Sequence, residues 1–358
     1  MTTAEKYMFR CLELAKNGMG NVSPNPMVGA IIVHEGKIIS EGFHAKYGEA
    51  HAEANAINSV KDVSLLKNST LYVNLEPCSH FGKTPPCAKL IISTQIPRVV
   101  IGNVDPSEKI AGKGIKMLRE AGIEVITNVL GNECRELNKR FFCVHEKRRP
   151  YIILKWAQSE DGFIDGVRSD NTTPPVRFSN ELTTTLVHKM RAEEDAILIG
   201  TNTALKDNPQ LTLRHWAGKN PTRMVIDRSL KIPENYYLFN NMAETLVFCH
   251  NEITGQARND GSNIHYIEID FSTDILPRLL SELMSRRINS VIVEGGALLL
   301  SSFIKSDLWD EAQIEIAPFS LRNGVKAPLI PLPPQSITEY ESNKIIQYKN
   351  TLIVNRKS

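Results

Sequence analysis

The sequence predicts an α/β protein made of two domains, and three observations lead to this expectation. Its 358 residues exceed the comfortable size of a single hydrophobic core. Strand-like and helix-like patterns alternate through both halves, which favours sheets sandwiched by helices. The charged stretch His145–Pro150, closed by a proline, separates the halves. We therefore expect domains at residues 1–146 and 150–358.

The first half begins with an amphipathic helix, in which Tyr7, Met8, Cys11, Leu12 and Ala15 fall on one face. Apolar runs then predict strands, and amphipathic runs predict helices. The expected strands are Val28–Val33, Lys37–Glu41, Thr70–Leu75, Arg98–Ile101 and Glu124–Ile126. The expected helices are His51–Ser59, Cys87–Ser93, Gly114–Glu120 and Glu133–Val144.

The second half repeats the alternation after Pro150. The expected strands are Tyr151–Ala157, Ala196–Ile199, Arg223–Asp227, Thr245–Cys249, Ser290–Glu294, Asp310–Ile316 and Ile345–Asn355. The expected helices are Ser179–Ala192, Ser272–Arg286 and Ala297–Ser306. No internal repeat and no low-complexity tract interrupts this pattern.

Composition narrows the class of protein. Hydrophobic residues make up 42% and charged residues 23% of the chain, as in ordinary globular proteins. A formal charge of +2 argues against a broad surface for nucleic acid or anionic membrane, although a small basic pocket for one phosphate remains possible. No run is long enough to cross a bilayer, and the first helix does not resemble a signal peptide. Six cysteines without disulfide-dense spacing suit a reducing compartment, so we expect a cytoplasmic protein.

One constellation carries recognisable chemistry. His51-Ala52-Glu53 is followed by Pro77-Cys78 and then by Cys87. A zinc ion held by one imidazole and two thiolates keeps a fourth position for water and lowers the pKa of that water. Glu53, two residues after the histidine, fits the carboxylate that moves protons without binding the metal. The pattern matches the H-x-E…P-C-x-x-C signature of zinc deaminases, except that an inserted loop places the second cysteine nine positions after the first.

Simpler explanations exist for each part of this constellation. A lone His-x-Glu carries almost no information, and two cysteines nine positions apart are commonly core residues. A structural zinc site would need a fourth protein ligand, which His80 is able to supply. The joint occurrence of His51, Glu53, Pro77-Cys78 and Cys87 favours the catalytic interpretation.

The longer segments around this constellation resemble one family. Asn25-Pro26-Met27-Val28-Gly29-Ala30, Gly42-Phe43-His44, Gly48 to Glu53 and the loop from Leu75 to Cys87 look like the bifunctional riboflavin-biosynthesis deaminase/reductase. The resemblance runs nearly end to end and is strongest over residues 20–110. It implies a cytidine-deaminase-like three-layer α/β/α domain followed by a dihydrofolate-reductase-like α/β domain.

The resemblance also implies a reaction for the first domain, the deamination of 2,5-diamino-6-ribosylamino-4(3H)-pyrimidinone 5′-phosphate with zinc as cofactor. It places the substrate against Asn25, His44, His80, Lys83 and Thr84. The chemistry of these side chains agrees: a lysine suits a phosphate, and an asparagine amide offers both donor and acceptor to a pyrimidinone edge. Each also has an ordinary alternative, because Asn25 precedes a proline in a common turn pair and Lys83 can be merely solvated.

By itself, the second half indicates only an α/β domain with a possible nucleotide site. Val293-Glu294-Gly295-Gly296-Ala297 follows a strand and opens a helix, which suits phosphate binding by backbone N–H groups, although a packing turn explains it equally well. No G-x-G-x-x-G follows a strand, so a Rossmann fingerprint is absent.

The resemblance adds a reductase that uses NADPH to convert the ribosyl group to ribityl. It rests on Ser159-Glu160-Asp161-Gly162, Gly200–Arg214, Pro221–Asp227 and the Glu-Gly-Gly segment. The positions that it places near NADPH are Ala157, Thr203, Asp207, Gly296 and Ala297. Those that it places near the substrate are Arg191, Leu211, Arg214 and Glu294. The family's Trp-Ile-Thr segment is replaced here by Thr173–Ser179, where Arg177 is an alternative partner for the extra phosphate of NADPH.

The leading hypothesis is thus a two-step enzyme acting on small phosphorylated pyrimidines, without nucleic acid or membrane partners. Transfer of an intermediate between two sites would be helped by assembly, so we expect a homo-oligomer, a dimer or a tetramer. One alternative is a zinc deaminase of another nucleoside or an RNA base with a non-catalytic C-terminal domain. Another is a zinc-stabilised scaffold without activity, against which the intact Glu53 argues.

Overall fold

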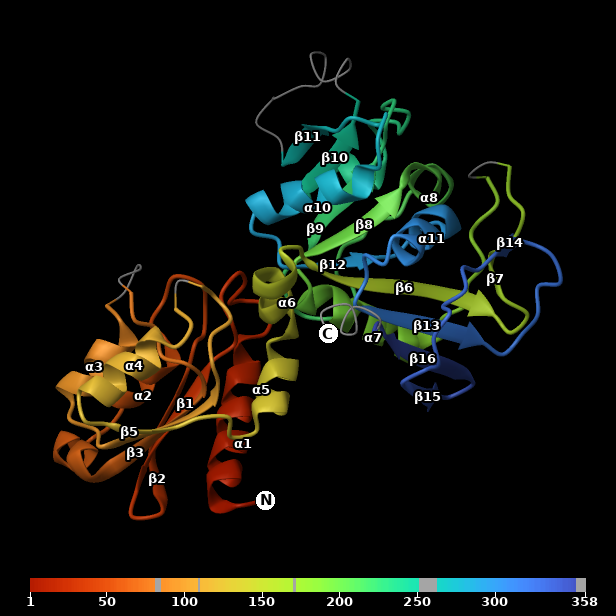
Figure 1. Ribbon diagram of the computed structural model, residues 1–358. Helices are drawn as coiled ribbons and strands as arrows, with labels where there is room; N and C mark the ends of the chain where they lie inside the picture. Colours follow the sequence, from red (N-terminus) through yellow and green to blue (C-terminus); the bar gives the residue numbers. More distant parts are fainter. Residues whose placement is uncertain (81–84, 109, 170–171, 251–262, 352–358) are drawn as a thin grey trace. The chain divides into compact units, whose positions relative to one another are not determined.

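The computed structural model describes residues 1–80, 85–108, 110–169, 172–250 and 263–351. The chain divides into two compact units, Met1–Arg148 and Arg149–Ser358 (Figure 1). None of the helices within the described ranges is long and apolar enough to cross a membrane.

The first unit is built on a five-stranded sheet in the order β2-β1-β3-β4-β5. Its strands are β1 (Gly29–His34), β2 (Lys37–Phe43), β3 (Ser69–Leu75), β4 (Arg98–Asn103) and β5 (Glu124–Ile126). β1 is antiparallel to both β2 and β3, whereas β3, β4 and β5 are mutually parallel. The carboxyl ends of β3 and β4 therefore meet at one edge of the sheet.

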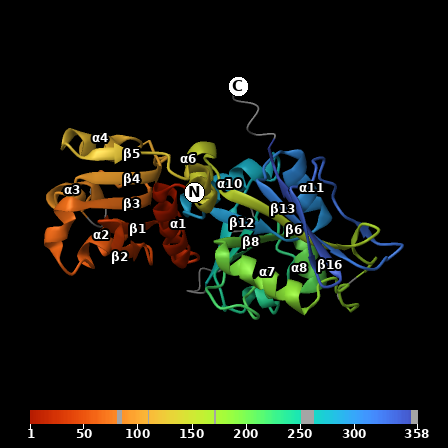
Figure 2. The same cartoon turned by 90° about the horizontal axis from the view of Figure 1, so that it is seen from below.

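Alternating apolar residues give this sheet two buried faces. Ala30, Ile32 and their equivalents on β3 and β4 face the helices α2 (Ala52–Asn58), α3 (Cys87–Ser93) and α4 (Lys113–Glu120). Ile31, Val33, Tyr72 and Val100 face α1 (Thr3–Ala15) and α5 (Gly131–Leu137). The result is a three-layer α/β/α unit, as expected from the sequence (Figures 1 and 2).

The expected single helix over Glu133–Val144 is wrong. Two helices occupy the region, α5 and α6 (Lys139–Lys147), and they meet at Asn138. The helix is interrupted at Asn138, and the side chain of this residue bonds the backbone of Met27. It accepts the Met27 N–H at 2.8 Å and donates to the Met27 C=O at 2.9 Å. A polar side chain buried in this way needs such partners, and they compete with helix continuity.

The second unit contains a nine-stranded sheet in the order β11-β10-β9-β8-β12-β6-β13-β16-β15. Its strands are β6 (Tyr151–Ser159), β8 (Ala196–Gly200), β9 (Thr222–Ile226), β10 (Thr245–Cys249), β11 (Ile264–Glu268), β12 (Ser290–Val293), β13 (Glu311–Ala317), β15 (Ser336–Tyr340) and β16 (Asn343–Lys349). All pairings from β11 to β13 are parallel, and β16 and β15 continue the sheet in antiparallel register.

Helices cover both faces of this sheet. The face that carries Ile152, Leu154 and Trp156 packs against α10 (Ile275–Ser285) and α11 (Ala297–Lys305). The opposite face packs Ile197, Ile199 and Val225 against α8 (Thr201–Asp207) and the 3₁₀ turn η3 (Tyr237–Phe239). A further helix, α7 (Glu181–Glu193), begins at Asn180, whose side chain accepts the N–H of Thr183 at 2.8 Å.

Most expected elements differ from the structure only by a few residues at their ends, where assignments normally vary. The last expected strand, Ile345–Asn355, instead lies at Asn343–Lys349, and the residues from 352 onward fall outside the described part. Apart from 3₁₀ turns, the unexpected elements among the described residues are α8, β11, β15 and the short pair β7 (Phe163–Asp165) and β14 (Val325–Lys326).

Candidate active sites

The predicted zinc ligands come from the ends of three elements of the first unit. His51 is the residue that precedes α2, Cys78 follows the carboxyl end of β3, and Cys87 is the first residue of α3. α2 lies directly on β2 because Gly42 has no side chain: a Cβ there would come within 2.6 Å of the Ala52 carbonyl oxygen. This close packing fixes the position of His51 at the start of α2.

The three ligand atoms fit a tetrahedral metal site. His51 Nδ1 lies 3.6 Å from Cys78 Sγ and 3.4 Å from Cys87 Sγ, and all three atoms lie within 4.8 Å of one another. Zinc–ligand bond lengths with tetrahedral angles give an N···S edge of about 3.6 Å. The donor set of one imidazole and two sulfurs also suits Zn²⁺. The side chains therefore fit this ion, and three protein ligands leave one position for another group.

The surroundings favour thiolate at Cys78. Hydrogen bonding from Cys87 and from His51 lowers the pKa of the Cys78 thiol. The backbone N–H of Cys87 also donates to Cys78 Sγ over 3.3 Å. The same contact with Cys78 raises the pKa of His51. The hydrogen bond between the two sulfurs raises the pKa of the Cys87 thiol, so this environment favours thiolate, the form that binds metal, at Cys78 and not at both sulfurs.

Glu53 lies in the first turn of α2, only 3% exposed. Burial raises its pKa to about 7, while the nearby His51 opposes the shift. A carboxyl group with a pKa close to neutral is able both to accept and to return a proton. Glu53 is not among the three residues whose ligand atoms cluster, but its side chain forms a hydrogen bond with Cys87 and so lies beside the candidate metal site.

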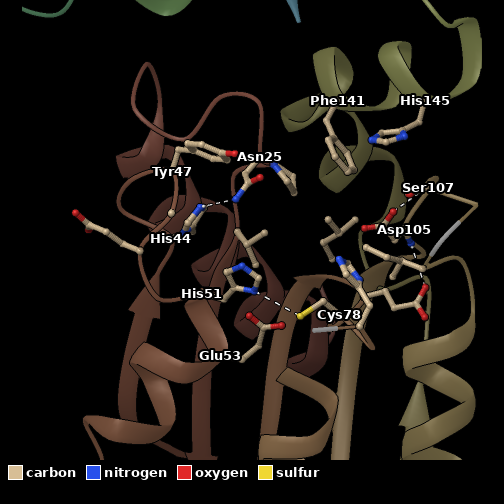
Figure 3. A pocket seen from close by; sticks show the side chains of 18 residues that line it. Asn25, His44, Tyr47, His51, Glu53, Cys78, Asp105, Ser107, Phe141 and His145 are labelled. Atoms are coloured by element: carbon tan, nitrogen blue, oxygen red, sulfur yellow. Dashed lines mark hydrogen bonds between the residues drawn. The ribbon is translucent and has the colours of Figure 1, made fainter. Parts of the chain in front are cut away.

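A cavity of about 410 Å³ opens above these residues, within the size range of small-molecule sites. Figure 3 shows His51, Glu53 and Cys78 at its base. Asn25, His44 and Tyr47 line one side, and Ser107, Phe141 and His145 line the other. The cavity therefore connects the candidate metal site to a mixed polar and aromatic surface.

Two of the predicted substrate contacts form an ordered pair. His44 Nδ1 lies 3.1 Å from the Ala50 carbonyl oxygen, so this nitrogen carries the proton and donates. His44 Nε2 is then the acceptor for the Asn25 amide, 3.2 Å away. Burial lowers the pKa of His44, which keeps the ring neutral and preserves this arrangement. The pair fixes the orientation of Asn25 in the cavity (Figure 3).

Of the other three predicted substrate contacts, the structure describes one. His80 lines the cavity. Lys83 and Thr84 lie outside the described residues. The sequence did not single out several other lining residues, among them Tyr47, Asp105, Ser107, Phe141 and His145.

Asp105 and Ser107 reach the cavity because β4 runs parallel to β3 and ends beside it. Glu76, at the end of β3, holds this segment with its buried carboxylate. It accepts the N–H groups of Asp105, Gly112 and Ile115 at 3.2, 2.9 and 3.1 Å. Burial raises the pKa of Asp105 to about 6. The rule that parallel strands place their carboxyl ends together is the signal by which this segment could have been found from the sequence.

In the second unit, several predicted cofactor residues gather at the carboxyl ends of parallel strands. Ala157 lies near the end of β6, Thr203 in the first turn of α8 after β8, and Gly296-Ala297 after β12. A Cβ on Gly295 would come within 2.8 Å of Thr203, and Gly296 has φ +65°. This edge thus presents closely approaching backbone at the start of α11, which fits the phosphates of a dinucleotide.

Asp207, also predicted near the cofactor, is bound by Arg168. The same guanidinium bonds Asp165 and the carbonyl oxygens of Thr173 and Lys206. This buried arginine joins β7, α8 and the segment that contains Thr173. The Arg177 side chain, the alternative partner for the extra phosphate, is exposed.

The predicted substrate residues of the second unit also lie together. Arg191 donates to Glu294 through Nε and Nη2, at 2.9 and 2.6 Å, in a partly buried bidentate pair. Leu211 is buried with φ +55°, and Arg214 is exposed three residues later. The backbone N–H of Arg214 reaches α7, the helix that carries Arg191, by bonding His188.

Comparison with known proteins agrees with this architecture. A family profile described as the cytidine and deoxycytidylate deaminase zinc-binding region matches residues 1–103, and the RibD C-terminal domain matches residues 150–354. The riboflavin biosynthesis protein RibD of Aquifex aeolicus is 38% identical over 90% of this chain and 88% of its own. That of Bacillus amyloliquefaciens is 40% identical over 90% and 86%.

The chain belongs to the RibD family of riboflavin biosynthesis proteins. Solved structures of RibD proteins are similar over their whole length. A diaminohydroxyphosphoribosylaminopyrimidine deaminase/5-amino-6-(5-phosphoribosylamino)uracil reductase from Thermotoga maritima is 36% identical, with 97% of this chain and 98% of that chain covered and a TM-score of 0.86. Acinetobacter baumannii RibD is 29% identical with the same coverage and a TM-score of 0.84.

The family resemblance and the predicted fold class are thereby confirmed: a cytidine-deaminase-like unit precedes a dihydrofolate-reductase-like RibD unit. The alternative of a zinc deaminase of another nucleoside or an RNA base with a non-catalytic C-terminal domain is not favoured, because the RibD C-terminal profile spans almost all of that half.

Proposed function

We propose that this RibD protein is a bifunctional enzyme of riboflavin biosynthesis, with a deaminase at residues 1–146 and a reductase at residues 150–358. The observation that carries the deaminase is the cluster of His51, Cys78 and Cys87 with buried Glu53 beside it, at the base of an open cavity. The substrate is 2,5-diamino-6-ribosylamino-4(3H)-pyrimidinone 5′-phosphate. Ammonia is the first product to leave.

His51, Cys78 and Cys87 hold the zinc ion, which supplies Lewis-acid activation of water when bound. Glu53 performs the proton transfers. Its carboxylate takes the first proton of the attacking water and delivers it to the ring nitrogen. It then takes the second proton from the hydroxyl added to the ring carbon and gives it to the amine, which leaves as ammonia. Burial keeps this carboxyl away from bulk solvent, so its proton passes to the substrate and not to the surroundings.

Asn25, His44, His80, Lys83 and Thr84 bind the substrate. The ordered Asn25–His44 pair supports recognition of the pyrimidinone edge, because one amide group is held in a fixed orientation. Lys83 and Thr84 supply a charge and a hydroxyl suited to the phosphate.

The reductase converts the ribosyl group of 5-amino-6-(5-phosphoribosylamino)uracil to ribityl, with NADPH as the hydride source. Ala157, Thr203, Asp207, Gly296 and Ala297 bind the cofactor. The close backbone at Gly295–Gly296 supports this assignment. The substrate is held by Arg191, Leu211, Arg214 and Glu294, among which the two arginines suit its phosphate.

A coupled assay tests both steps. Purified protein is incubated with the diaminopyrimidinone phosphate, first alone and then with NADPH. We expect release of one ammonia per substrate without NADPH and equimolar oxidation of NADPH when it is added. Cytidine and a short RNA serve as comparison substrates, and neither should release ammonia. Absence of ammonia from the diaminopyrimidinone phosphate contradicts the proposal.

We also propose that the enzyme assembles as a dimer or a tetramer, since assembly would help one active site to pass its product to the next. Light scattering coupled to size-exclusion chromatography measures the mass in solution. A mass equal to that of the 40.1 kDa chain contradicts this part of the proposal.

A further inference from the structure

His188 lies in the last two turns of α7, and its side chain is only 2% exposed. Neither the sequence motifs nor the family resemblance singled it out. Arg191 follows one turn later on the same helix, and the segment containing Arg214 packs against its ring. His188 therefore sits between the two arginines that are proposed to bind the substrate.

The ring of His188 makes one specific hydrogen bond. Its Nδ1 accepts the backbone N–H of Arg214 over 3.2 Å, so this nitrogen carries no proton and the neutral ring has its proton on Nε2. The ring also packs edge-on against His215, with centroids 4.9 Å apart. These contacts tie the backbone at residues 214 and 215 to helix α7.

The charges around His188 keep it neutral. Burial lowers its pKa most, and Arg191, Arg214 and His215 lower it further, to about 4, against the opposing effect of Glu294. A protonated ring would place a third cation among the two arginines and would lose its acceptor. The hydrogen bond to Arg214 and the positive charge of the two arginines thus both require the neutral form of His188.

The two arginines differ in their partners. Arg191 forms a bidentate ion pair with Glu294. Within the described ranges Arg214 has no carboxylate at ion-pair distance, and its Nη1 donates to the neutral amide of Gln210 at 3.1 Å. An exposed guanidinium without a carboxylate partner is the group in this cluster most suited to a phosphate dianion.

We propose that His188 is a positioning residue of the reductase site: its neutral ring anchors the backbone of Arg214 and thereby directs that guanidinium toward the substrate phosphate. This inference rests on the proposed reductase function. It predicts that loss of the Nδ1 acceptor weakens binding of phosphorylated substrate while the hydride-transfer rate is kept.

The test compares His188→Leu, which lacks an acceptor, with His188→Asn, whose Oδ1 occupies nearly the same place as Nδ1. His265→Leu on the edge strand β11 is the matched control. The readout is NADPH oxidation with 5-amino-6-(5-phosphoribosylamino)uracil and with its dephosphorylated form. For His188→Leu we expect KM for the phosphorylated substrate to rise about tenfold or more, the loss typical of a displaced charge-assisted contact.

The same variant should leave kcat within about twofold and KM for the dephosphorylated substrate unchanged, and His188→Asn should behave like the wild type. Equal losses on both substrates, or an Asn variant as impaired as the Leu variant, overturn the inference. Should His188→Leu fail to fold, His188→Gln replaces it, because its amide oxygen cannot reach the Nδ1 position. Wild-type protein that oxidises no NADPH would instead contradict the proposed function itself.

Discussion

Glu76 offers the sharpest test of how the deaminase cavity is built. Its carboxylate is 4% exposed and accepts three backbone N–H groups, two on Oε2 and one on Oε1. Replacement by glutamine keeps one oxygen and turns the other into a donor. If the amide oxygen keeps the Asp105 and Gly112 contacts, the Ile115 N–H faces an NH₂ group and loses its partner.

The expected cost follows from these contacts. A buried hydrogen bond to a charged group contributes about 1.5–3 kcal/mol, and an unsatisfied buried donor costs about 1–3 kcal/mol. Glu76→Gln should therefore lower the free energy of local opening at residues 105–115 by about 2–3 kcal/mol. By the relation of 1.4 kcal/mol per tenfold, the amide of Ile115 should exchange with solvent roughly 30- to 150-fold faster.

The assay is native-state hydrogen exchange, combined with deaminase kinetics. We expect KM for the diaminopyrimidinone phosphate to rise, because Asp105 and Ser107 line the cavity on the loosened segment. Glu120→Gln is the control, since Glu120 is 66% exposed and, among the residues that the structure describes, pairs with Lys116 of its own helix alone. Unchanged exchange at Ile115 together with unchanged KM would refute the view that Glu76 organises this segment.

Three further predictions concern single side chains. Glu53→Gln should lower deaminase kcat by about 10²–10⁴-fold, the usual contribution of a proton-transfer group, while zinc content and NADPH oxidation persist; loss of zinc with activity would indicate a structural role. Lys83→Ala should raise deaminase KM far more than it perturbs the reductase, and equal damage to both steps would argue against separate sites. His188 has a folded-state pKa of about 4 against an ordinary value of 6.5, so the unfolded chain binds more protons between these values. The free energy of unfolding of the second unit should thus fall as pH drops from 6.5 toward 4, and His188→Asn should reduce that slope. Tryptophan fluorescence measures it, because all three tryptophans lie after residue 150.

The strands were predictable because their signal is local. Runs such as VGAIIV and TLYVNL are apolar on both faces, as buried strands between two helical layers must be. The break at Asn138 was not predictable in this way, because its cause is a pair of hydrogen bonds to Met27, 111 residues earlier. β11 was missed for a related reason: most of its residues are only partly buried, so its pattern is weak.

The same difference between local and long-range signals separates the site residues that were predictable from those that were not. His51, Glu53, Cys78 and Cys87 were predictable because metal binding restricts the ligands to few residue types, and the signature keeps their order in spite of the inserted loop. Phe141 and His145 line the cavity from α6, with ring centroids 4.5 Å apart, yet nothing in their local sequence distinguishes them from a helix core. Only the folded chain brings them to the same cavity.

Both units position their candidate site residues by the same geometric rule, at the carboxyl ends of parallel strands. In the first unit β3 delivers Cys78 and β4 delivers Asp105, while in the second β8 and β12 deliver Thr203 and Glu294. Side chains beyond the strand ends then need anchors, because loops alone do not hold a side chain to within a fraction of an ångström. Glu76 anchors one such loop through three N–H groups, and His188 anchors another through one. Because neither side chain belongs to the reacting set, changes at both should alter substrate binding before they alter the chemical step.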